Sequence, residues 1–155
     1  MRNGMPVDVC VENPDLLALL RKCHEAKLHG GAAVVWGTGS PRREFIYADD
    51  VADACLFLMR APEAPPVVNV GAGEDVSIRE LAERIRALVG LEAPLAFDER
   101  RPDGAPRKLL DSSRMRALGW MPTTSLDAGL ARTYAWFGET VARGAASGVP
   151  AESLR

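Results

Sequence analysis

The sequence is poor in the residues that most enzymes use for proton transfer and metal binding. It has only two histidines, His24 and His29, in 155 residues. Both lie near the polar end of one helical pattern, where solvated histidines are more common than catalytic ones, and the local pattern offers no obvious acidic partner to orient either ring. The chain has no H-x-x-x-H pair, which would put two histidine ligands on one helical face, with a third ligand nearby. We therefore expect no metal site, and solvated rather than catalytic histidines.

Cysteine and long apolar runs are also scarce. Cys10, Cys23 and Cys55 form no C-x-x-C pair, and the last two fall on apolar positions of helical patterns, so we expect them to be reduced and structural. No stretch approaches the roughly 18 apolar residues that span a bilayer, and the first residues contain no apolar run with a cleavage site. These absences predict a cytoplasmic protein without a membrane partner.

The charge balance excludes a further class of partner. A net charge of -2 gives no general attraction to nucleic acid or anionic lipid, although a local basic patch could still bind a small phosphate ligand. With 47% hydrophobic and 26% charged residues, the composition is that of one soluble globular domain.

Apolar periodicity in the first half of the chain alternates between helix and strand. Asn13 and Pro14 are a predicted N-cap and first helical position, and the helix they begin ends at the glycine pair 30–31. Short apolar runs at 32–36 and 44–47 predict strands on either side of a turn. From Asp49 a second helix is predicted, with an apolar face formed by Val51, Ala54, Cys55, Leu58 and Met59.

The second half continues the alternation. The run 67–70 predicts a strand, and Ser77 with Glu80 forms a capping box for a helix that ends at Gly90. Residues 94–97 predict another strand. A short helix capped by Gly119 and a last helix ending near Phe137 follow, with a flexible tail expected over residues 138–155. The fold class is therefore mixed α/β.

Two glycine-rich turns and two tyrosines offer no cofactor site. Neither W-G-T-G-S-P nor N-V-G-A-G-E-D matches G-x-G-x-x-G between a strand and a helix. Neither Tyr47 nor Tyr134 stands four residues before a lysine, as a Tyr-Lys hydride-transfer site on one helix requires.

The segment 98–111 carries far more charge than a turn needs. A Pro-Asp-Gly turn at 102–104 explains the prolines and the glycine but not the cations around it. Guanidinium groups bind diphosphates, tryptophan stacks on a base or sugar, and carboxylates accept from sugar hydroxyls. A nucleotide sugar would suit this chemistry, while ordinary surface charge remains the alternative. The residues concerned are Lys22, Trp36, Arg43, Asp103, Arg107 and Lys108.

Six strings occur in order along the chain: L-L-R-K-C-H-E-A, V-V-W-G-T-G-S-P-R-R-E-F, D-D-V-A-D-A-C-L-F-L-M, N-V-G-A-G-E-D-V-S-I-R-E-L-A, R-P-D-G-A-P-R-K-L-L-D and L-G-W-M-P. Together they resemble the carboxyl-terminal half of the GDP-L-fucose synthase family, over about residues 12–137, with 1–11 an unmatched leader. The second and fifth strings are specific to this family among extended short-chain dehydrogenases.

The resemblance implies an NADP-dependent epimerase and reductase that converts GDP-4-keto-6-deoxy-mannose to GDP-L-fucose. It implies a substrate-binding lobe here, with the last strand and helix elements of the Rossmann lobe but without the Rossmann core. The family's substrate-contacting residues fall on Lys22, Trp36, Arg43, Asp103 and Lys108.

The departures from the family pattern concern catalysis. The family's cofactor loop, Ser-Tyr-Lys residues and epimerase cysteine precede the matched segment, and Pro14 stands where its second epimerase acid/base, a histidine, belongs. We therefore expect no catalytic residue, no cofactor bound by this chain alone, and binding of a GDP-sugar without turnover.

Three alternatives remain open at this point: a fragment or truncated relative of the synthase, which we favour; a stand-alone nucleotide-sugar binding module or a piece of another sugar epimerase or dehydratase; and a folded remnant without a ligand. Apolar faces that would pack on the missing Rossmann sheet predict self-association or a partner chain.

Overall fold

The computed structural model describes residues 15–61 and 65–146, and the fold there is mixed α/β, as the sequence predicted. Cys10 and the predicted N-cap at Asn13 and Pro14 lie outside the described residues. Helix α1 (Asp15–His29) buries Leu19, Leu20 and Cys23 and ends before two glycines with positive φ. Burial raises the pKa of the Cys23 thiol, in keeping with a structural, unreactive residue.

Within residues 15–61 and 65–146, five short strands form two small sheets. Strand β1 (Ala33–Trp36) pairs in parallel with β4 (Leu95–Asp98), with Trp36 opposite Asp98. The second sheet has β2 (Arg42–Glu44) in the centre, antiparallel to β3 (Asp75–Ser77) and parallel to β5 (Arg107–Lys108). The two strands expected on either side of the 37–41 turn therefore belong to different sheets.

Helix α3 (Ile78–Val89) confirms the local sequence prediction in detail. The Ser77 hydroxyl accepts a hydrogen bond from the Glu80 N–H at 3.1 Å, and the Glu80 carboxylate accepts from the Ser77 N–H at 2.7 Å. Gly90 ends the helix with φ 72°. Its apolar side chains Ile78, Leu81, Ala82, Ile85 and Val89 are buried, and Leu88 is half-buried. Capping groups and periodicity lie within the segment itself, so they form irrespective of the distant chain.

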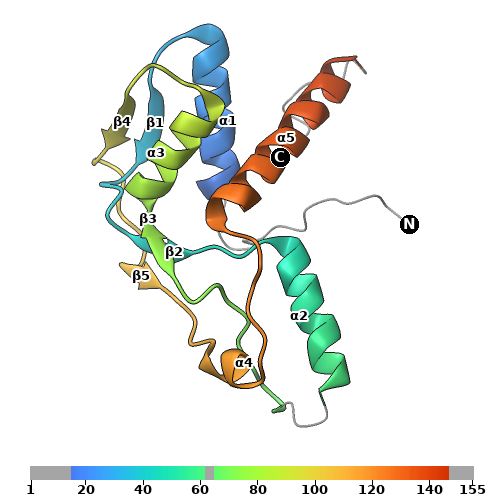
Figure 1. The fold of residues 1–155 in the computed structure, drawn as a ribbon. Helices are drawn as coiled ribbons and strands as arrows, with labels where there is room; N and C mark the ends of the chain where they lie inside the picture. Colours follow the sequence, from blue (N-terminus) through green and yellow to red (C-terminus); the bar gives the residue numbers. More distant parts are fainter. Residues whose placement is uncertain (1–14, 62–64, 147–155) are drawn as a thin grey trace.

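The main core lies in the upper part of the molecule (Figure 1). The β1–β4 sheet covers one side of α1 and α3, and α5 (Leu126–Ala146) lies on their other side. The buried side chains of this core come from all four of these units and, for Phe45 and Leu91, from the loops after β2 and α3: Leu19, Leu20, Cys23, Ala33, Val35, Phe45, Ile78, Leu81, Ala82, Ile85, Val89, Leu91 and Leu130.

A second, smaller cluster holds the lower part together. It joins α2 (Ala48–Arg60) to α4 (Ser113–Ala117) through Ala54, Met115 and Trp120. The Trp120 indole N–H donates to the Asp53 carboxylate at 2.9 Å. Gly119, with φ 92°, follows the end of α4 as the sequence predicted, and its N–H donates to the Arg116 carbonyl.

Three sequence predictions of local structure are wrong. The run 67–70 is not a strand, because no strand of the described chain pairs with it. The strand expected at 44–47 is shifted to Arg42–Glu44, since β3 and β5 supply hydrogen-bonding partners only there. Helix α5 continues past Phe137 to Ala146, so the expected tail from residue 138 is in part helical. Alanine, glutamate and arginine, all good helix formers, outweigh the glycines in that stretch.

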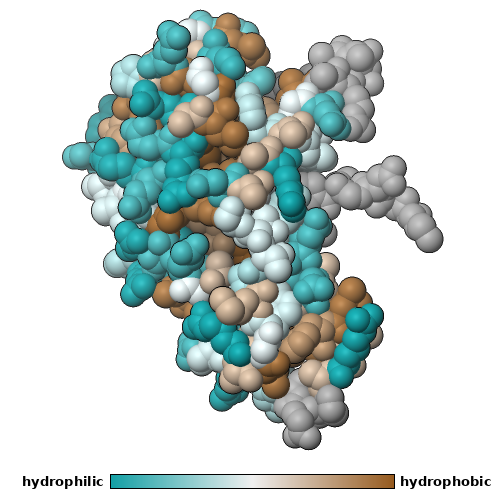
Figure 2. Space-filling model, in the orientation of Figure 1, coloured by the Kyte–Doolittle hydropathy of each residue, from teal (hydrophilic) through white to brown (hydrophobic). Residues whose placement is uncertain are grey.

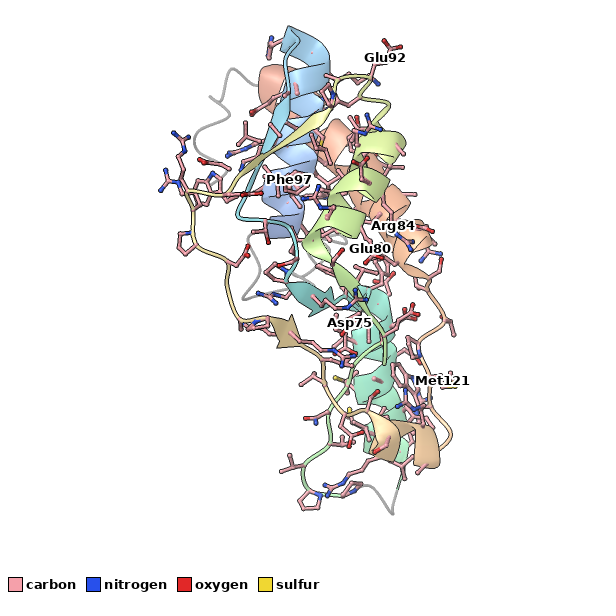
Figure 3. The ribbon with its side chains drawn as sticks, turned by 90° about the vertical axis from the view of Figure 1, so that its left-hand side faces the viewer. Asp75, Glu80, Arg84, Glu92, Phe97 and Met121 are labelled. Carbon is pink, nitrogen blue, oxygen red and sulfur yellow. The ribbon has the colours of Figure 1, made fainter. Side chains whose placement is uncertain are left out.

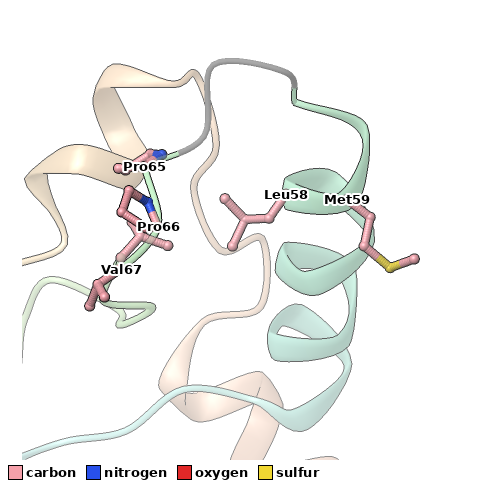
Figure 4. A pocket seen from close by; sticks show the side chains of 6 residues that line it. Leu58, Met59, Pro65, Pro66 and Val67 are labelled. Carbon is pink, nitrogen blue, oxygen red and sulfur yellow. The ribbon is translucent and has the colours of Figure 1, made fainter.

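The predicted apolar face of α2 is only partly covered, with Val51 and Leu58 half-buried. Ala54 is buried, whereas Cys55 is exposed and Met59 is 83% exposed. Figure 2 shows hydrophobic atoms gathered over this helix at the lower right. At its end, Leu58 points toward Pro66 and Val67 on the returning chain, while Met59 points away (Figure 4). The described chain thus leaves an apolar surface on α2 unpartnered.

Asp50 links this part of the molecule to the segment before α5. Its buried carboxylate accepts hydrogen bonds from the Thr123 N–H and hydroxyl, at 3.1 and 2.9 Å, and from the Thr124 N–H at 3.0 Å. Burial alone would raise the pKa of Asp50, but these hydrogen bonds outweigh it and hold the pKa below its ordinary value.

Replacing Asp50 by alanine should lower the free energy of unfolding by about 2 kcal/mol at pH 7, because the two threonine amides lose their acceptor. A group with a depressed folded pKa stabilises above its unfolded pKa, and this stabilisation disappears as the pH falls through the folded pKa. Urea unfolding of both proteins from pH 7 downward should therefore give converging stabilities in acid. Asp49→Ala, at the exposed neighbouring position, is the matched control. An equal loss in both variants would contradict this role.

Candidate functional site

Trp36 is an exposed indole with a cation beside it from each of two segments. It ends β1 and is 62% exposed. The ammonium of Lys22, on α1, lies 4.9 Å from the ring centroid and donates to the Val34 carbonyl at 2.9 Å. The guanidinium of Arg101, from the loop after β4, lies 4.9 Å from the ring centroid as well. The structure therefore brings Lys22 and Trp36 together, and adds Arg101, which the sequence analysis did not select.

The glycine-rich turn after Trp36 receives Asp103. The Asp103 carboxylate accepts from the Thr38 N–H at 2.9 Å and from the Thr38 hydroxyl at 2.7 Å, and these bonds lower its pKa. A Cβ at Gly37 would lie 2.2 Å from one of its oxygens, so only glycine allows this approach. Gly37 also has φ 79°, in the left-handed region. The predicted ligand group Asp103 thus joins its own loop to the end of β1.

Arg43 and Lys108 are opposite each other in adjacent parallel strands. Their register in β2 and β5 places both side chains on one face of the sheet. Arg43 is buried, and its Nη1 donates to the Arg42 carbonyl at 2.8 Å and the Ala105 carbonyl at 2.7 Å. Lys108 is exposed. The exposed ammonium of Lys108 therefore comes from the position beside Arg43. The Arg43 guanidinium also binds the loop that contains Asp103, through the Ala105 carbonyl.

The opposite face of this sheet carries a carboxylate between two arginines, which sequence reasoning missed. Asp75 in β3 accepts from Arg42 Nε at 2.6 Å and from Arg107 Nε. Hydrogen bonds from Arg107 and then Arg42 hold the pKa of Asp75 below its ordinary value. The only available signal was period-2 alternation in R-R-E, which separates Arg42 from Arg43 by face. To find the Asp75 group from the sequence, one would also have had to know that β2, β3 and β5 are neighbours in one sheet.

The sequence led us to expect a solvated His24, but the structure shows this side chain packed against α5. It is half-buried between α1 and α5, where its Nδ1 lies 3.0 Å from the Tyr134 hydroxyl and its ring makes edge contacts with Tyr134 and Phe137. These are packing contacts with α5. Within the described ranges no group of three or more metal-ligating side chains occurs, and no helix there is long and apolar enough to cross a membrane.

Comparison with known proteins first gives the class. Residues 13–71 match the NAD dependent epimerase/dehydratase family. This range runs from α1 through β1, the glycine-rich turn, β2 and α2, and it contains Lys22, Trp36 and Arg43. The chain is therefore related to the nicotinamide-dependent enzymes of this class.

Within that class the chain is related to the GDP-L-fucose synthases, and the resemblance stated from its sequence is confirmed. It is 48% identical over 144 residues to GDP-L-fucose synthase 1 of Arabidopsis thaliana, covering 87% of this chain and 45% of that protein. Identity to GDP-L-fucose synthase of Escherichia coli is 46%, covering 77% of this chain and 40% of the relative. The chain spans less than half the length of these relatives.

Solved structures agree with this relationship. A GDP-L-fucose synthetase from Naegleria fowleri bound to NADP superimposes with a TM-score of 0.75 at 26% identity, over 81% of this chain and 40% of the other. The fold of the described residues is thus that of part of an extended short-chain dehydrogenase, and NADP is a ligand of that relative.

Proposed function

We propose that these residues form the carboxyl-terminal, substrate-binding region of a GDP-L-fucose synthase-like protein, and that they bind a GDP-sugar. The observation that carries the proposal is the exposed Trp36 ring with Lys22 and Arg101 beside it, at the end of β1. An exposed indole next to cations can stack on a planar or sugar ring while the cations bind phosphate. Identities of 46–48% to GDP-L-fucose synthases support this ligand class.

The proposed binding residues are Lys22, Trp36, Arg43, Asp103 and Lys108. Asp103 and Arg43 act in part on the loop itself, through Thr38 and Ala105. Lys108 and Trp36 are exposed and suit direct contact with a diphosphate and a ring. We place the binding region at 12–137, with 1–11 and 138–155 outside it.

Catalysis, in this proposal, needs chain that these 155 residues do not include. The resemblance implies that the Rossmann core, cofactor loop, Ser-Tyr-Lys residues and epimerase cysteine lie in the other part of the synthase, so NADP would bind there. The unpartnered face of α2 then packs on that part, or on a second copy when it is missing. A stand-alone nucleotide-sugar binding module is the second candidate. It is favoured by the fact that Trp36 and the two cations beside it, Lys22 and Arg101, all belong to this chain.

Calorimetric titration of GDP into this chain should give saturable binding, and Lys108→Ala should weaken the affinity by about tenfold, because one charge-assisted phosphate contact is lost. Arg84→Ala, which removes an exposed ion pair between Arg84 on α3 and Asp127 on α5, is the matched control and should leave the affinity unchanged.

Unchanged titrations for Lys108→Ala and Trp36→Ala would contradict the assigned site, and absence of saturable binding would favour a ligand-free remnant. NADPH oxidation above background by this chain with the GDP-keto sugar would contradict the view that catalysis needs further chain.

A further inference from the structure

We propose that Asp75 is a positioning residue that fixes strand β5 against β2 and so sets where Lys108 presents its charge. This inference rests on the proposed function for its consequence, GDP-sugar affinity. Its structural content, the attachment of β5, is independent of any ligand. Nothing in the sequence motifs pointed to Asp75, because its role depends on two residues more than 30 positions away along the chain.

Each oxygen of the Asp75 carboxylate is bound by a different arginine. Oδ1 accepts from Arg42 Nε at 2.6 Å, and Oδ2 accepts from Arg107 Nε. Arg42 Nη2 also donates to the Asp75 backbone carbonyl at 2.9 Å. The Asp75 side chain is 4% exposed, whereas that of Arg107 is 60% exposed, so the guanidinium groups lie over a buried carboxylate. Figure 3 shows Asp75 at the level of the small sheet, below Glu80.

Without this carboxylate the two arginines would oppose each other. Arg42 and Arg107 are direct register partners in β2 and β5, which places their side chains on the same face. Like charges directly opposite across two strands are destabilising. Asp75 lies between them and converts this repulsion into two charge-assisted hydrogen bonds. The Glu80 carboxylate, 3.5 Å from Arg42 Nη1, adds an electrostatic attraction to Arg42 but makes no such pair with Arg107.

Strand β5 is a short, exposed edge strand. It is two residues long, and residues 101–111 are all exposed. Besides the ladder, β2 binds the residues on either side of β5: the Arg42 N–H donates to the Pro106 carbonyl at 2.8 Å, Arg43 donates to the Ala105 carbonyl, and the Leu110 N–H donates to the Glu44 carboxylate at 3.0 Å. Strands this short are marginal without further contacts. The Asp75–Arg107 contact adds a side-chain link to a residue of β5 itself, next to Lys108.

The test is hydrogen–deuterium exchange and GDP titration of Asp75→Asn, which keeps the size of the side chain but removes its charge. We expect faster exchange in peptides covering 104–110, unchanged exchange in α3, and GDP affinity lower by roughly tenfold, a coupling expected of neighbouring groups. Asp75→Glu should restore part of both. Asp127→Asn, which breaks an exposed ion pair, is the control and should change neither.

Two further variants keep the proposal falsifiable. Arg107→Gln removes the β5 side of the link at an exposed position and should reproduce the faster exchange even if Asp75→Asn fails to fold. Combined with Lys108→Ala, Asp75→Asn should cost less affinity than the sum of the single changes, because both act through Lys108. Unchanged β5 exchange in Arg107→Gln overturns the proposal, and so does full additivity. A wild-type chain that does not bind GDP refutes the proposed function. In that case, hydrogen–deuterium exchange of the Asp75→Asn and Arg107→Gln variants still tests whether Asp75 attaches β5.

Discussion

Replacing Leu20 by alanine is expected to lower the free energy of unfolding by about 2–5 kcal/mol. Leu20 is fully buried on α1, in the core that joins α1, α3, β1 and α5. Truncation removes apolar surface from that core and leaves a cavity, which a closely packed interior closes only in part. This is a large fraction of the stability of a domain of this size. Urea unfolding followed by circular dichroism measures the loss.

Leu28 provides a matched control on the same helix. It is the same residue type with a side chain 62% exposed, so Leu28→Ala removes little buried surface. We expect a change within about 0.5 kcal/mol, as for surface substitutions in general. Equal losses for Leu20→Ala and Leu28→Ala would mean that α1 does not pack on the core as described.

If α2 mediates the proposed self-association, changing both Leu56 and Met59 to lysine should leave the chain monomeric. Both side chains are exposed on α2, Leu56 by 51% and Met59 by 83%, and their i, i+3 spacing puts them on one side of the helix. Two ammonium groups cannot be buried without partners, so an apolar contact made through this face is lost. Sedimentation velocity over a range of protein concentrations measures the change in mass.

Leu28→Lys is the control for this second prediction, because Leu28 is exposed on α1, a helix that packs in the main core and not in the cluster around α2. It should leave the association unchanged. A wild-type chain that is a compact, stable monomer at all concentrations would refute the role of α2 as a contact surface. Dissociation by Leu28→Lys instead would place the contact on α1.

The prediction from sequence succeeded where structure is decided within a few neighbouring residues. The α3 capping box and its end at Gly90 rest on contacts between residues at most four apart, and periodicity marks its buried face. The residues proposed for the site also come from the sequence and from its family resemblance, and they stay a prediction.

The prediction failed where pairing between distant segments decides. The run 67–70 has the apolar composition of a strand, but a strand forms only where a partner supplies its hydrogen bonds. The same rule moved the second strand back to Arg42–Glu44, where β3 and β5 lie beside it. Composition alone contains no information about which edges meet.

The sequence by itself determined the mixed α/β class, the helices α1 and α3, and the list of residues proposed for the site. Only the tertiary structure decided what those groups touch: Asp103 on the Thr38 turn, and Asp75 between Arg42 and Arg107. The physical reason is range, because capping and periodicity act within one or two helical turns. Charge pairing and strand register instead depend on which distant segments the core brings together.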